Sequence, residues 1–175
     1  MKNVLFVLAL LFVTAINAQK GQTFPEITGR TLSDKAITIP IKNNKTTIVG
    51  IAYNRAAEDE LKKWLNPLYN TFIPKPAGTQ NFDVAQIYDV NFVFVPMIAG
   101  FKKIAEDFKA STDKEFWPYI VDTERTDIKE LKKKLGIQDD KIAYFYVLDK
   151  DGKILESVNG KFSEAKMDKL EEAAE

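Results

Sequence analysis

Residues 142–158 read IAYFYVLDKDGKILESV, and this stretch decides the fold. Two β-rich runs, Ile142 to Leu148 and Lys153 to Val158, flank the tetrapeptide Asp149-Lys150-Asp151-Gly152. An Asp-Gly turn between such runs is a strong hairpin signal, so the two runs are predicted to pair as antiparallel strands. The alternative, half of a calcium loop, requires flanking helices and a distal Glu, and Glu156 lies too close to serve. We therefore predict a turn and no metal site.

Upstream of the hairpin, a nearly continuous β-rich run extends from Thr46 to Tyr53. Such a run is typical of a central strand that is buried on both faces. Asn54 and Arg55 end it, and Ala56 to Phe72 follows with apolar residues at helical spacing. Pro67 inside this helix is expected to kink or divide it. The pattern predicts a central strand that runs directly into a helix.

The same signals predict the remaining elements. Long crossovers between strands require parallel pairing, while the hairpin adds an antiparallel strand. The sequence therefore predicts an α/β fold, a three-layer sandwich with a mixed central sheet and helices on both faces. The other predicted elements are an edge strand at Ala36 to Ile41, a strand at Phe82 to Val90, a helix at Asn91 to Lys109, a strand at Trp117 to Val121, a helix from Asp127 to Leu135 capped by Thr126 and stopped by Gly136, and a closing helix at Ser163 to Ala174.

Residues 1–18 are predicted to be a signal peptide. A charged start at Met1-Lys2-Asn3 precedes an apolar run from Val4 to Ala15, and Ala18 offers a small residue for cleavage before Gln19. The run is too short to span a bilayer, which needs roughly 20 apolar residues. We expect residues 19–175 to form a single domain of a bacterial protein that is periplasmic or secreted, with no stable membrane anchor after cleavage.

The composition excludes several functions. Lys and Arg number 25, and Asp and Glu number 25, so no net charge attracts nucleic acid. The chain has no cysteine and no histidine. These absences exclude disulfide exchange, thiol peroxidase chemistry, zinc sites of Cys/His type and nucleophilic catalysis that depends on histidine. We predict no cofactor.

With Leu135-Gly136-Ile137 followed by Tyr146 to Ile154, the sequence resembles the thioredoxin-like superfamily, particularly its exported redoxins. In those proteins a helix ends at Gly, and the hairpin reads as three apolar residues followed by Asp-x-x-Gly-x-Ile. Ile48 to Tyr53, leading into Ala56 to Trp64, is similar to the strand-to-helix turn that bears their active site. The resemblance implies a thioredoxin-like fold over nearly all of the mature chain.

The chain departs from that family at both redox positions. Where redoxins place Cys-x-x-Cys, this chain has Asn54 to Asp59, and where they place a cis-proline it has Ala143. The functional residues of the family therefore cannot be carried over, and the domain is expected to be redox-inactive.

A narrower resemblance is to a cysteine-poor branch, the mitochondrial F-type ATPase assembly factors and their bacterial relatives. The similar elements are Phe24-Pro25, Trp64-Leu65-Asn66-Pro67 and Tyr144-Phe145-Tyr146. Because those relatives act by binding partner proteins, the resemblance implies a chaperone-like or assembly role toward an unidentified envelope or secreted protein.

A second hypothesis is a small-molecule binder or a cryptic non-thiol enzyme. Asn54, Arg55, Asp89 and Asp122 follow predicted strands, and ligands of open α/β sheets bind outside the carboxyl ends of strands. Arg55 beside a helix N-terminus would suit a carboxylate or phosphate. The alternative is that these polar residues simply end strands in solvated loops.

A hydrophobic run gives the candidate protein contact. Phe92, Phe94, Val95, Met97 and Ile98 are more apolar than a one-sided surface helix requires. They form either the buried start of the helix or an exposed patch for another protein.

Overall fold

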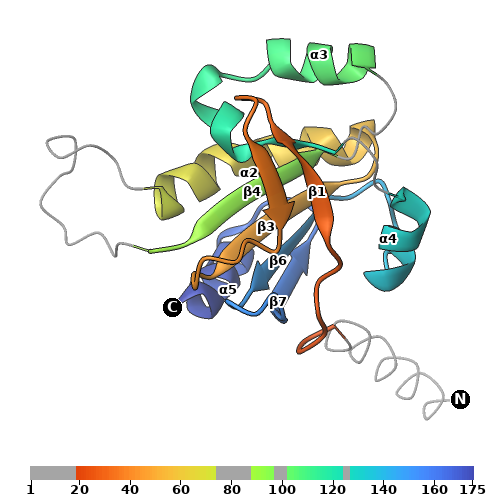
Figure 1. Cartoon of the computed structure of the whole chain (residues 1–175). Coiled ribbons are helices and arrows are strands. Elements are labelled where there is room, and N and C mark those ends of the chain that lie inside the picture. Colours follow the sequence, from red (N-terminus) through yellow and green to blue (C-terminus); the bar gives the residue numbers. More distant parts are fainter. Residues whose placement is uncertain (1–18, 74–87, 97–101, 124–126) are drawn as a thin grey trace, which may run out of the picture.

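The computed structural model describes residues 19–73, 88–96, 102–123 and 127–175 (Figure 1). Its helices and strands, in chain order, are β1 (Ile27–Thr31), β2 (Ala36–Ile39), β3 (Thr47–Ala52), α2 (Arg55–Phe72), β4 (Asn91–Pro96), α3 (Lys102–Ala110), the 3₁₀ helix η1 (Lys114–Tyr119), β5 (Val121–Asp122), α4 (Ile128–Lys134), β6 (Tyr144–Leu148), β7 (Ile154–Asn159) and α5 (Glu164–Ala174).

The strands form two sheets that meet at one bridge. The four-stranded sheet has the order β4-β3-β6-β7, in which β4 is parallel to β3 and the other pairs are antiparallel. The three-stranded sheet has the order β2-β1-β5 and is antiparallel throughout. A parallel bridge between Phe94 and Ile120 connects them. The predicted mixed sheet is confirmed.

Helices cover both faces of the four-stranded sheet. One hydrophobic cluster joins the sheet to α2 and α5 through residues such as Trp64 and Leu170, and the other joins it to α4 through Leu131. Because side chains alternate along a strand, β3 contributes Ile48 to the first cluster and Val49 to the second. This arrangement is the predicted three-layer α/β sandwich.

The central strand and the helix that follows it agree with the sequence, apart from the effect of Pro67. All six residues of β3 are buried, as predicted for a central strand. Helix α2 continues through Pro67 as one helix of 18 residues, so of the two predicted effects, a kink or a division, the division does not occur. The carbonyl that the missing N–H would have bound belongs to Lys63, an exposed residue. In the described part of the chain, no helix combines the length and hydrophobicity needed to cross a membrane.

The largest error of the sequence analysis lies between α2 and α3. The predicted helix from Asn91 to Lys109 is wrong in its first part, because Asn91–Pro96 is the buried strand β4 and the helix α3 begins at Lys102. A short run that is apolar all round does not distinguish a buried helix from a buried strand. The strand predicted at Phe82 to Val90 is tested only at its end: residues 82–87 lie outside the described ranges, and Tyr88 to Val90 belong to no strand.

Smaller corrections concern the segment from η1 to α4. Trp117 was expected in a strand but lies in η1, and the strand β5 is only Val121–Asp122. Asp127 caps α4, because its carboxylate accepts hydrogen bonds from the N–H groups of Lys129 and Glu130. Thr126, the predicted cap, lies outside the described residues. Strand β1 was not predicted.

From β6 to the C-terminus, the structure agrees closely with the prediction. β6 and β7 form the expected hairpin, and Asp149 Oδ1 accepts hydrogen bonds from the N–H groups of Asp151 and Lys153 across the turn. This carboxylate therefore stabilises a turn, as predicted. Helix α5 follows with Met167 and Leu170 buried.

Candidate functional site

The segment that replaces Cys-x-x-Cys begins at Asn54, between β3 and α2. The Asn54 side chain caps α2 by accepting a hydrogen bond from the N–H of Ala57, with a donor–acceptor distance of 3.1 Å. Its Nδ2 donates to Asp140 Oδ1 at 3.1 Å, and Lys132 Nζ donates to Asp140 Oδ2 at 2.7 Å. The hydrogen bond and charge of Lys132 hold the pKa of Asp140 below its usual value. Three side chains thus form a hydrogen-bonded network at the N-terminus of α2.

Buried tyrosines lie behind this network. Tyr53, the residue before Asn54, is 7% exposed, and its ring lies edge-on to that of Tyr144 with centroids 6.3 Å apart. The hydroxyls of Tyr53 and Tyr146 are buried and have no hydrogen-bond partner. Burial, and secondarily the neighbouring tyrosines, raise the pKa of both hydroxyls. Neither tyrosine therefore supplies a phenolate at neutral pH.

Glu58 is a site residue that the sequence analysis missed. It lies in the first turn of α2 and is only 6% exposed. Burial raises the pKa of Glu58, and the nearby charges of Lys62 and Arg55 offset part of that rise. An acidic residue in a first helical turn is usually read as a favourable partner of the helix dipole on the surface, so nothing in the sequence marked this one as buried.

The four predicted ligand-binding residues do not line one cleft. Arg55 is exposed beside Asn54, at the carboxyl end of β3. Asp122 lies in β5, where it pairs in register with Arg30 of β1. Asp89 lies at the opposite end of the sheet, where it forms an ion pair with Lys45 just before β3. The prediction failed for Asp89 because this residue precedes the strand β4 instead of ending one.

The predicted protein-contact residues divide into two groups. Phe92, Phe94 and Val95 lie in β4 and are at most 4% exposed, so the exposed-patch interpretation is wrong for them and the core interpretation is confirmed. Met97 and Ile98 lie outside the described residues.

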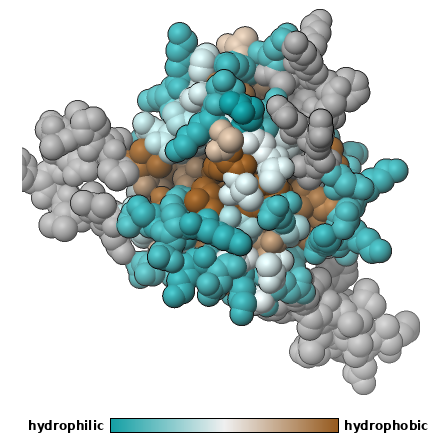
Figure 2. Space-filling view, viewed as in Figure 1, coloured by the Kyte–Doolittle hydropathy of each residue, from teal (hydrophilic) through white to brown (hydrophobic). Residues whose placement is uncertain are grey.

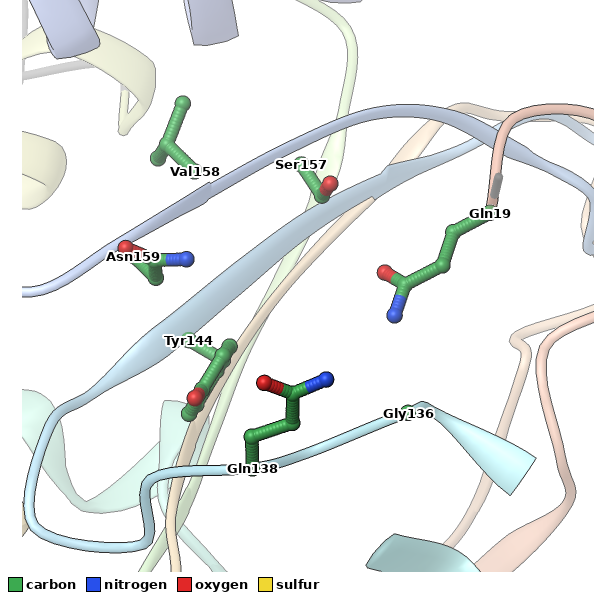
Figure 3. A pocket seen from close by; sticks show the side chains of 7 residues that line it. All are labelled: Gln19, Gly136, Gln138, Tyr144, Ser157, Val158 and Asn159. Carbon is green, nitrogen blue, oxygen red and sulfur yellow. The ribbon is translucent and has the colours of Figure 1, made fainter. Parts of the chain in front are cut away.

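An uncharged cavity of about 160 Å³ lies beside the edge strand β7 (Figure 3). In Figure 3 the Gln19 and Gln138 side chains point into it from opposite sides, while the Val158 side chain points away. No side chain of the lining carries a charge. No local signal joins its residues. They come from residues 19–26 before β1, here called the leader, from the segment after α4 and from the two strands of the hairpin: Gln19, Gly136, Gln138, Tyr144, Ser157, Val158 and Asn159.

Hydrophobic residues reach part of the described surface. In the view of Figure 2, hydrophilic residues lie above and below a zone of hydrophobic and pale residues across the middle of this face. Among the described residues, Leu155 of β7 is the large hydrophobic residue classed as exposed, at 40%.

Solved structures show which fold this is. The thioredoxin domain of a thiol-disulfide oxidoreductase from Bacteroides vulgatus superposes with a TM-score of 0.61 at 17% identity, covering 89% of this chain and 98% of that chain. BsSco, a member of the Sco family of cytochrome c oxidase assembly proteins, gives 0.58 at 15% identity, covering 88% and 94%. Yeast Sco1 gives 0.55 at 17% identity, covering 89% and 94%. The fold is therefore thioredoxin-like, as the hairpin and the central βα unit predicted.

The family follows from a match over nearly the whole chain. No curated protein sequence matches this one significantly. The family model described as ATP10 protein matches residues 12–173. That range includes Phe24-Pro25, the Trp64 to Pro67 element and the tyrosine-rich strand β6, on which the resemblance to assembly factors was based. The chain therefore belongs to the ATP10 protein family, the F-type ATPase assembly-factor branch of the thioredoxin-like fold.

Proposed function

We propose that this chain is a non-catalytic thioredoxin-like protein that acts outside the cytoplasm by binding other proteins, in a chaperone-like or assembly role. The observation that carries the proposal is the hydrogen-bonded network at the N-terminus of α2. There the side chains of Asn54, Asp140 and Lys132 bond to one another at the position where redoxins carry their thiols.

This network takes up part of the chemical resources of the position, although the cationic side chain of Arg55 remains exposed there. A helix N-terminus activates a nucleophile or binds an anion through free N–H groups and positive charge. Here Asn54 accepts a hydrogen bond from the N–H of Ala57, and Asp140 neutralises the nearby charge of Lys132. No cysteine is present anywhere in the chain. A fold that keeps its core while losing this chemistry is well suited to a binding role.

Family membership and the signal-peptide pattern support the rest of the proposal. The assembly factors that the chain resembles act by binding partner proteins, and the pattern of residues 1–18 is that of an export signal. Non-obligate interfaces are about as apolar as the rest of a protein surface, so the mixed surface of this protein suits a transient partner.

Photo-crosslinking in the native cell envelope tests the proposal. A photoreactive amino acid would replace, one at a time, three exposed residues on different parts of the molecule: Arg55, Lys133 and Leu155. We expect at least one position to give a discrete crosslinked product that excess unlabelled protein competes away. The absence of a competable product at all three positions, in a protein shown to be exported and folded, would contradict the binding role.

A further inference from the structure

Strand β7 is the outer strand of the four-stranded sheet, and the leader covers only its first part. Thr23 forms an antiparallel bridge with Lys153. The Gly21 N–H donates to the Ile154 carbonyl at 2.7 Å, and the Ile154 N–H donates to the Gln22 carbonyl at 2.9 Å. The leader therefore acts as a short additional strand at this edge.

The leader then leaves the edge through a turn. The Gln22 N–H donates to the Gln19 carbonyl at 3.1 Å, and Gly21 has a φ of 80°, which favours glycine. Beyond this turn, Glu156 to Asn159 pair with β6 on one side and, among the described residues, with no strand on the other. The second half of β7 is thus an open sheet edge.

In this open half, the backbone N–H and C=O groups of two residues point away from β6. The Gly160 N–H donates to the Ala143 carbonyl, just beyond the end of β6, so Gly160 faces inward. Because main-chain groups alternate between the two sides of a strand, Ser157 and Asn159 face outward. In agreement, the Ser157 N–H is bonded only to a side chain of its own strand, Glu156 Oε1, at 2.9 Å.

The surroundings of the open half indicate what it would accept. The cavity beside Ser157 and Asn159 has no charged side chain, and its lining combines amides, hydroxyls and backbone with apolar atoms of residues such as Tyr144 and Val158 (Figure 3). At one end, the Lys20–Glu156 ion pair, with an N–O distance of 2.8 Å, satisfies both charges. A strand added to this edge would place every second side chain on the cavity side of the sheet. The cavity suits a neutral side chain that forms hydrogen bonds, such as Asn, Gln, Ser or Thr.

We propose that the open half of β7 binds an extended segment of the partner polypeptide as an added strand, with an uncharged hydrogen-bonding side chain in the cavity. The inference rests on the proposed binding function and names its surface. Exposed sheet edges are templates for such pairing. The leader, which already pairs with the same edge, supports a peptide as the occupant. A second copy fits less well, because antiparallel pairing about Ser157 would set Lys153 opposite Lys161 at a place that the leader occupies.

A display experiment tests this surface directly. The probe is a phage library of random linear nonapeptides, selected on the purified protein. We expect the selected peptides to bind Ser157→Pro at least tenfold more weakly than the parent. Binding to Ser157→Ala should fall much less, because alanine removes one hydroxyl from the cavity lining but keeps the backbone N–H. Proline removes the outward N–H and obstructs pairing, and an edge strand tolerates it where that N–H is not part of the ladder. Alanine keeps the backbone donor and serves as the matched control.

N-methylated peptides keep the test decisive even if Ser157→Pro unfolds. A selected peptide would be made in two versions, each methylated at alternate backbone amides. Strand addition predicts that one version loses binding and the other keeps it, because only alternate amides face β7. Equal binding of both versions, undiminished binding to a folded Ser157→Pro, or failure to select any peptide would overturn the inference. A dimer in sedimentation that Ser157→Pro converts to monomer would overturn it in favour of a second copy.

The experiments distinguish a failure of the β7 surface from a failure of the proposed binding function. If the envelope partner still crosslinks to a folded Ser157→Pro variant through a probe at Arg55, the binding role stands and the β7 surface is wrong. If no probe position captures a partner, the binding role itself fails.

Discussion

At the scale of single residues, Asn54 has a structural role at the position where redoxins carry their reactive thiols. Its oxygen caps α2 while its nitrogen binds Asp140, which is 86 residues away in the chain. The two contacts tie the start of the helix to the segment between α4 and β6. The residue thus stabilises the region where redoxins carry their thiols.

Replacing Asn54 with alanine is expected to lower the free energy of unfolding by about 1 kcal/mol, because a helix cap is lost. Asn54→Ser is the matched control: it keeps a capping oxygen but loses the Asp140 contact, so it should lie between the parent and Asn54→Ala. Urea unfolding followed by circular dichroism measures both. Equal stability of Asn54→Ala and the parent would show that the cap contributes nothing.

Glu58 should make stability depend on pH in the opposite sense from a paired carboxylate. Burial raises its pKa in the folded protein, so its ionised form destabilises the fold. This penalty is absent below the unfolded pKa of about 4.3 and develops as pH rises toward the folded value. We expect Glu58→Gln to raise the melting temperature at pH 7 and to leave it unchanged near pH 3.5. Asp59→Gln, at an exposed neighbour, is the control, and a pH-independent effect of Glu58→Gln would refute the explanation.

At the scale of elements, the contact between β3 and α2 depends on Gly50. A Cβ added there would lie 2.8 Å from the Phe145 ring, 2.9 Å from the Phe94 ring and 3.0 Å from Leu61 Cδ1. Real Cβ atoms do not approach side chains so closely, so the strand needs glycine for α2 to pack at its present distance. The constraint arises from packing, since no positive φ is involved.

Gly50→Ala is therefore expected to destabilise the protein by about 1–3 kcal/mol through overpacking. A double-mutant cycle with Leu61→Ala gives the cause. Shortening Leu61 removes one of the three close contacts, so the added cost of Gly50→Ala should be smaller in that background. Additive effects of the two substitutions in thermal unfolding would mean that the strain lies elsewhere.

The elements also show what the sequence was able to predict. The hairpin, β3 and α5 carry local signals that agree with their burial, and each was predicted within a few residues. Strand β4 was mistaken for a helix because its apolar run has no readable period, and Asp89 was misplaced as a consequence. The Asn54–Asp140–Lys132 network and the cavity beside β7 join residues far apart in the chain, so no local pattern announces them.

At the scale of the whole molecule, the leader fastens the N-terminal end of the chain to the sheet. Phe24 is 2% exposed and packs edge-on against Tyr146, with ring centroids 5.4 Å apart. We expect Phe24→Ala to cost about 3–5 kcal/mol, as for other buried aromatic residues. Pro25→Ala, at the next and less buried position, is the control and should cost much less. A small effect of Phe24→Ala in urea unfolding would mean that the leader is not part of the core.

The expected cleavage site of the signal peptide can be compared with the contacts of the leader. The expected cleavage site, between Ala18 and Gln19, lies immediately before the first described residues, and these contact the fold: Gln19 Nε2 donates to the Leu135 carbonyl and Lys20 pairs with Glu156. Cleavage there would keep every described contact of the leader. We expect intact-mass measurement of the protein released from the envelope of its own cells to give a chain that begins at Gln19. Ala18→Arg, which removes the small residue at the junction, should retain residues 1–18 and stay with the membrane fraction. Recovery of the uncleaved parent chain from the cytoplasm would exclude export, and the search for its partner would then move to that compartment.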